Sequence, residues 1–233
     1  MRNGNAISTP QARTNPLLRN VYLWMTAGLA LTTVVAYLIG NNANLLARLY
    51  NSGLFFMLIF AQLAIVMVLS FRIRNMSARS AILWFAVYSV CTGAMLSAVI
   101  AVYAKAVVAR AFLTTALMFG GMSIYAMSTK RDLSRMGNIL VMALFGMIAM
   151  SLVNLFLKSE ALYYYMSFIG VALFCGLTAW DTQKIIRLNN EYGYDIDEET
   201  FVKLSIICAL ELYLDFINIF LYLLRIFGRG NRS

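Results

Sequence analysis

Two carboxylic acids stand inside a long apolar stretch near the carboxyl end of this sequence. Residues 210–224 read LELYLDFINIFLYLL, and Glu211 and Asp215 lie in the interior of that run. A carboxylate in hydrocarbon is costly, so acids in such a segment face a protein interior or a water-filled cavity and mark ion or proton pathways. Their spacing of four residues places both acids on one face of an α-helix.

The same helix face continues as a polar stripe along an otherwise apolar segment. Steps of three and four residues collect Cys208, Glu211, Asp215, Asn218, Tyr222 and Arg225. In a bundle of membrane helices, a single polar stripe turns toward the protein or a water-filled cavity. A hydrogen-bonding seam that only holds helices together is the alternative interpretation, although two acids exceed what such a seam needs.

A third acid closes the preceding apolar segment, in the run TAWDTQKIIR at 178–187. Asp181 lies at the apolar edge, and it shares a helix face with Ser167, Gly170, Phe174 and Thr178. If the two segments pack as antiparallel neighbours, Asp181 and Asp215 come within reach of each other. Two carboxyl groups in contact away from water cannot both ionise easily, so they would share a proton. Doubly ionised, they would form a hard-oxygen site suited to calcium.

The elements that must position these acids are membrane helices. The chain has 233 residues, of which 61% are hydrophobic and 12% charged, against roughly half and a quarter in soluble domains. Seven apolar segments approach the roughly 20 residues of a spanning helix: 21–40, 53–71, 81–103, 111–127, 137–157, 162–180 and 203–227. We therefore predict an all-α membrane protein with a polar tail at 1–20, one seven-helix domain at 21–227 and a basic tail at 228–233.

Basic residues predict the orientation of these helices. An amino terminus inside the cell places twelve of the nineteen lysines and arginines in cytoplasmic segments, as the positive-inside rule requires. The first apolar run is too long for a signal-peptide core and is expected to stay as an anchor. The basic tail then lies outside, against the rule, so a last segment that enters and returns is the alternative. The net charge of +9 fits these loops and anionic lipid, and it makes no case for nucleic acid.

Enzyme chemistry finds little support in this sequence. It contains no histidine, and Cys91, Cys175 and Cys208 fall in three different apolar segments, as buried hydrophobes would. No nucleophile–base pair and no glycine-rich phosphate loop are visible, so we predict neither an enzyme nor a bound cofactor. Gly93 and the pair Gly120–Gly121 are interpreted as sites of close helix packing.

Two motifs resemble those of the Bax inhibitor (transmembrane Bax inhibitor motif) family. They are WDTQKI at 180–185 and LYLDFINIF at 212–220, which match the aromatic-Asp-Thr-Gln run of the family's sixth helix and the Leu-Asp-Phe run of its seventh. LSFRIRNMS at 69–77 and YSVCTGAMLSAVIAVY at 88–103 are similar to the bacterial branch. The likeness extends from about residue 17 to 228.

The resemblance implies a fold and a function. The last helix would be wrapped by the other six, and the protein would leak calcium down its gradient with opening set by pH. Asp181 and Asp215 would form the family's aspartate pair, and Arg72, or failing that Arg74, would latch onto the pair in the closed state. Glu211 is an additional acid that not all members have.

Three function classes stay open at this stage. The first is the pH-gated cation leak, with calcium, protons and the lipid bilayer as its partners. The second is a proton-coupled transporter. The third is a non-conducting regulator or inhibitor of another membrane protein, such as a membrane protease, contacted through the tail at 1–20. The compact length and the absence of a retrieval signal favour a bacterial inner membrane.

Overall fold

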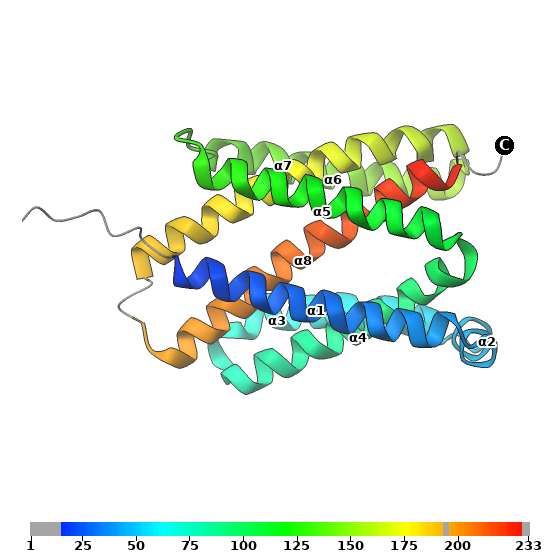
Figure 1. The fold of residues 1–233 in the computed structure, drawn as a ribbon, viewed down its shortest axis with the longest axis horizontal. Coiled ribbons are helices and arrows are strands. Elements are labelled where there is room, and N and C mark those ends of the chain that lie inside the picture. Colours follow the sequence, from blue (N-terminus) through cyan, green and yellow to red (C-terminus); the bar gives the residue numbers. More distant parts are fainter. Residues whose placement is uncertain (1–14, 193–195, 230–233) are drawn as a thin grey trace, which may run out of the picture.

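The computed structural model describes residues 15–192 and 196–229, and these ranges are built from helices (Figure 1). Seven of these helices are long and apolar enough to cross a membrane, one for each predicted segment, which confirms the predicted fold class. The helical elements are α1 (Pro16–Gly40), α2 (Ala43–Asn51), α3 (Leu54–Arg72), η1 (Ile73–Asn75), α4 (Ala78–Val102), α5 (Lys105–Ser128), α6 (Ser134–Leu157), α7 (Glu160–Tyr192) and α8 (Glu198–Arg229).

Several helices extend beyond their predicted ends. α1 begins at Pro16 rather than at residue 21, because the Asn15 side chain caps it by accepting a hydrogen bond from the Leu18 amide at 2.9 Å. α7 continues to Tyr192 and α8 begins at Glu198, so both helices extend into the stretch between the predicted segments 162–180 and 203–227. The predicted ends differ because hydropathy indicates the limits of the hydrocarbon core and not the ends of the helix. α7 has 33 residues and is about 50 Å long, so it extends beyond that core.

The last helix occupies the centre of the bundle. α8 crosses the bundle obliquely between α1 and α5 (Figure 1), and it packs against α1, α4, α5 and α7. Of its spanning segment 67% is buried, against 11% for the span that contains α3 and 6% for α6. The predicted central position of the last helix is therefore confirmed. The structure adds that the wrapping has two layers, because α3 packs mainly on α4 and α6 on α7.

The two outer helices expose large apolar side chains over most of their surface. Phe60 on α3 is 69% exposed and Phe156 on α6 is 84% exposed. Lipid tails are as apolar as these side chains, so such exposure costs nothing in a membrane. The same surface would drive a water-soluble protein to associate.

Close helix packing was predicted at Gly93 and at Gly120–Gly121, and the structure confirms it at Gly93 only. A Cβ atom at Gly93 of α4 would lie 2.6 Å from the Thr32 carbonyl oxygen, so only glycine permits the close crossing of α1 and α4. Nothing lies within 4 Å of such an atom at Gly120 or Gly121 of α5. The prediction of close packing at Gly120–Gly121 is therefore wrong, because these positions border open space between helices.

The last helix is long enough to cross the membrane completely. α8 runs without interruption over 32 residues, about 48 Å against a hydrocarbon core of about 30 Å. The end of α8 lies at the opposite end of the bundle from the start of α1 (Figure 1). A segment that enters the membrane and returns to the same side must interrupt its helix inside the bilayer. α8 has no such interruption between Glu198 and Arg229.

We expect the amino terminus and the α5–α6 connection to be cytoplasmic and the end of the chain to be outside. In a variant without native cysteines, Lys130→Cys should resist an impermeant thiol reagent added to intact cells, and Asn231→Cys should react. Both should react after the membrane is permeabilised. Protection of Asn231→Cys in intact cells would contradict the seven-crossing topology. Residue 231, like the tail residues 1–14, lies outside the described ranges.

Candidate functional site

The polar stripe of α8 faces α7 along most of the contact between these antiparallel helices. Asp215 meets Asp181, and one turn earlier Glu211 meets Lys184. Toward the other end, Tyr222 packs on Phe174, with ring centroids 5.9 Å apart. The predicted α7 face that carries Ser167, Gly170, Phe174, Thr178 and Asp181 is buried at all five positions. The two stripes predicted from helical periodicity therefore lie against each other.

Asp181 and Asp215 form a buried carboxyl pair at this interface. Their side chains are within hydrogen-bonding reach of each other, and the two residues are 6% and 4% exposed. A hydrogen bond between two carboxyl groups requires a proton on one of them. The Oδ2 atom of Asp215 is buried without a hydrogen-bond donor among the described residues, and the Thr178 hydroxyl donates to the Phe174 carbonyl oxygen at 2.8 Å. The geometry thus suits a shared proton.

An ion pair lies next to the aspartates, one turn along the interface. The Lys184 Nζ atom donates to Glu211 Oε1 at 2.7 Å and to Oε2 at 2.9 Å. Both side chains are 32% exposed, so this pair borders solvent while the aspartates do not. Lys184 also lies 5.6 Å from the centre of the Trp180 ring. Lys184 balances the charge of Glu211 and places a cation near Asp181.

Comparison with known proteins identifies the family and the relatives of this chain. Residues 14–232 match the profile of the family described as "Inhibitor of apoptosis-promoting Bax1". The chain belongs to the Bax inhibitor family. Inner membrane protein YbhL of Escherichia coli K12 is 48% identical, with 96% of each chain covered. An uncharacterised protein of Deinococcus radiodurans is 45% identical over 93% of this chain and 90% of its own, and one of Borreliella burgdorferi is 37% identical over 92% of each.

The location and the family predicted from the sequence both agree with these relatives. YbhL is named as an inner membrane protein, and the seven apolar helices make this chain a multi-pass membrane protein as well. The family profile covers both aspartate motifs and nearly the whole chain. The resemblance stated from the motifs is therefore confirmed.

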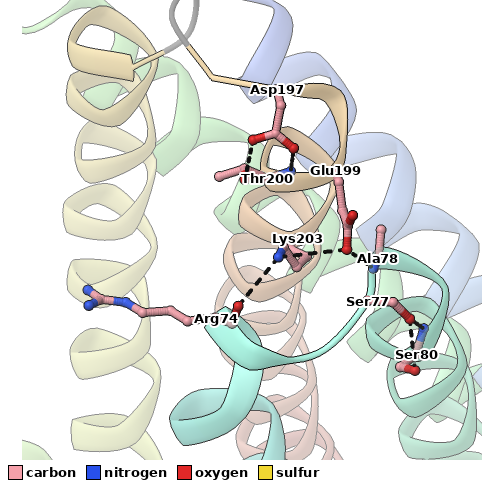
Figure 2. A network of polar contacts seen from close by, with 8 residues as sticks. All are labelled: Arg74, Ser77, Ala78, Ser80, Asp197, Glu199, Thr200 and Lys203. Carbon is pink, nitrogen blue, oxygen red and sulfur yellow. Dashed lines mark hydrogen bonds and ion pairs between the residues drawn. The ribbon is translucent and has the colours of Figure 1, made fainter.

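The arginine latch implied by the family resemblance is not formed in this structure. Arg72 and Arg74 are exposed, and neither makes an ion pair among the described residues. Figure 2 shows the Arg74 side chain outside the network in which its carbonyl oxygen accepts from Lys203 at 3.5 Å. The latch stays a prediction, and Lys184 is the basic residue that the structure places beside the aspartates. Lys184 follows Asp181 by three residues, and this spacing places the two side chains on the same face of α7. The spacing was therefore a signal in the sequence for this neighbour.

The same network ties the α3–α4 hairpin to the start of the central helix. Glu199 of α8 accepts a hydrogen bond from the Ala78 amide at 3.3 Å, and it also lies 3.8 Å from the Lys203 ammonium (Figure 2). Arg74 belongs to η1, which contacts α8, as does α4, the second helix of this hairpin. A displacement of the hairpin would therefore be felt by α8 directly.

Calcium ligands are few at the aspartate pair. Within residues 15–192 and 196–229, no group of three or more His, Cys, Asp or Glu side chains is placed to hold a metal. Two carboxylates supply at most four oxygens, whereas calcium takes six to eight. Glu211 does not add to them, because Lys184 occupies both of its oxygens. Calcium as a permeant or transiently bound ion at this pair therefore stays a prediction.

A second polar contact on α8, missed by the sequence analysis, fixes the rotation of the helix. The Tyr213 hydroxyl lies 2.6 Å from the Thr32 hydroxyl, which donates to the Ser89 carbonyl oxygen at 2.9 Å. Tyr213 is fully buried, and its ring meets Phe85 and Tyr88 edge-on. This contact anchors α8 to α1 and α4, so that the stripe with Asp215 points toward α7.

We expect the interface between α7 and α8 to be intolerant of added volume. A Cβ atom at Gly170 would lie 2.5 Å from the Tyr222 ring, so Gly170→Val should lower the free energy of unfolding by about 1–3 kcal/mol. Gly146→Val is the matched control, because the same change on α6 meets nothing within 4 Å. Thermal unfolding in detergent measures both. Equal unfolding temperatures for the two variants would contradict the close contact.

Proposed function

We propose that this protein is a pH-sensitive calcium leak channel of the inner membrane, with the Asp181–Asp215 pair as its gate. One observation carries the proposal: two buried carboxyl groups from neighbouring helices meet in the centre of the bundle. Ionisable groups inside a membrane protein are costly, tend to pair with one another and mark ion or proton pathways. Membership of the Bax inhibitor family supports the same interpretation.

The gate is proposed to work by proton loss. While one proton is shared, the two carboxyl groups hold α7 and α8 together and carry a single negative charge. Loss of that proton leaves two like charges in contact, which repel each other and create a site of higher affinity for a divalent cation. Calcium flux should therefore rise with pH and fall in acid.

The neighbouring ion pair is proposed to moderate this gate. Lys184 and Glu211 lie one turn from the aspartates, at the more exposed end of the contact. A cation at this point lowers the local attraction for calcium, and Glu211 offsets it in turn. The balance between these two charges determines how strongly calcium is attracted to the aspartates.

The decisive experiment measures calcium entry into liposomes that contain only this protein and enclose a calcium-sensitive dye. We expect entry that follows the gradient and increases from mildly acidic to mildly alkaline pH, with none in protein-free liposomes. Movement of calcium against its gradient, coupled to protons, would instead indicate a transporter. No flux at any pH would reject the channel and favour the non-conducting regulator. In that case deletion of residues 1–14 should abolish the biological effect.

A further inference from the structure

A polar cavity lies at the end of the bundle where α8 ends, away from the aspartate pair. Its volume is about 550 Å³, and it is bounded by the end of α4, the start of α7 and the end of α8. Its charged residues are Arg225, Arg229 and Glu160, and its aromatic residues are Tyr103, Tyr163 and Tyr164. These are the arginines whose position outside the cell opposes the positive-inside rule. The proposed channel function does not account for them.

Both arginines are held by aromatic rings rather than by acids. The Arg225 guanidinium lies 4.2 Å from the centre of the Tyr163 ring, and that of Arg229 lies 4.7 Å from the centre of the Tyr164 ring. Neither arginine makes an ion pair within the described ranges, although Glu160 borders the same cavity. Stacking fixes a guanidinium while its N–H edge stays available for an anion. The two arginines lie one helical turn apart, so both can reach one anionic group.

An apolar cavity lies next to the polar one and shares Tyr103 with it. Its volume is about 310 Å³, and it is enclosed by α1, α4, α5 and α8, with Phe112 and Phe216 among its walls. Apart from Lys105 and two threonines, its lining residues are aliphatic or aromatic. A polar cavity with two cations beside an apolar cavity matches the two parts of a phospholipid. The apolar cavity would contribute nothing to the binding of free phosphate.

We propose that this end of the protein binds an anionic phospholipid. Arg225 and Arg229 hold its phosphate through charge-assisted hydrogen bonds, and an acyl chain enters the adjacent apolar cavity past Tyr103. Tyrosines at this depth are typical of the membrane–water interface, where the headgroup lies. The lipid would tie α8 to α4 and α7 at their outer ends. The site would also give the outward arginines a counter-charge.

The test is native mass spectrometry of the full-length protein in detergent, titrated with phosphatidylglycerol and with phosphatidylcholine of the same acyl chains. The wild-type protein should prefer phosphatidylglycerol. The double variant Arg225→Gln/Arg229→Gln should lose about tenfold or more of that preference. Arg225→Lys, which keeps the charge but loses the planar fork, should fall between them. Arg48→Gln is the matched control, because it removes an exposed arginine of α2 at the same end of the bundle.

Two further arms separate a lipid from a free anion. Excess inorganic phosphate should not displace phosphatidylglycerol, and Ala109→Phe, which fills the apolar cavity, should weaken long-chain but not short-chain phosphatidylglycerol. Displacement by phosphate, or no effect of Ala109→Phe, would overturn the lipid assignment. Equal binding of the two lipids by the wild-type protein, or a double variant that folds and keeps its preference, would overturn the site itself. Thermal unfolding in detergent identifies any variant that fails to fold.

Discussion

Replacing either aspartate of the central pair by asparagine should flatten the pH dependence of calcium flux. Asp181 and Asp215 are buried and within hydrogen-bonding reach of each other, and in the proposed gate they share one proton. An amide at either position cannot take part in that titration, and the remaining carboxylate has no like charge to repel it. Calcium entry into liposomes across pH, with each single variant and the double variant, measures the effect.

The double variant shows whether the two aspartates act together. Because they form one unit, Asp181→Asn/Asp215→Asn should change the flux little more than either single variant does. The departure from additivity should be about 1 kcal/mol or more, roughly a fivefold difference in flux. Additive effects, or single variants with an unaltered pH profile, would show that the pair is only a packing seam. Asp132→Asn, on the α5–α6 connection, is the control that removes an exposed carboxylate whose partner is Arg187 and not either aspartate.

Removing Lys184 should raise the basal leak and destabilise the protein. Lys184→Met leaves Glu211 as a half-buried carboxylate without its partner, at a cost of about 1–3 kcal/mol. The lost positive charge also strengthens the attraction of this region for calcium, so flux should increase at every pH. Glu211→Gln should have the opposite effect on flux, because it leaves the cation unbalanced. The double variant Lys184→Met/Glu211→Gln should recover most of the stability.

A second lysine–glutamate pair on α8 provides the matched control. Lys203 and Glu199 form a 3.8 Å contact at the start of α8. Lys203→Met breaks this contact, and this variant should leave the flux unchanged. Arg72→Ala tests the latch implied by the family resemblance. If Arg72→Ala raises the leak and Lys184→Met does not, the role proposed here for Lys184 is wrong and the arginine latch is correct.

The fold class and the residues that share a helix face follow from the amino-acid sequence alone. Seven apolar runs of spanning length imply seven membrane helices, because unpaired backbone groups cannot be left in lipid. The helical period placed Asp215 and Glu211 on one stripe of α8 and Asp181 on the matching stripe of α7. Antiparallel packing of these two helices would bring Asp181 and Asp215 within reach of each other, but periodicity alone could not prove it. The pairing itself was implied by the family resemblance, and the structure places the two side chains close together.

Only the tertiary structure decided what surrounds the aspartates. Periodicity assigns a residue to a face of its own helix, but not the rotation of that helix or its neighbours, which depend on packing across the bundle. Lys184 lies beside the aspartates on α7, whereas α3 packs mainly on α4 and leaves Arg72 exposed, so the arginine latch stays a prediction. The anchoring of Tyr213 by Thr32 joins residues far apart in the sequence. The polar cavity with Arg225 and Arg229 likewise forms only where the ends of three helices meet. The sequence pattern of a single helix does not indicate which helix ends lie together.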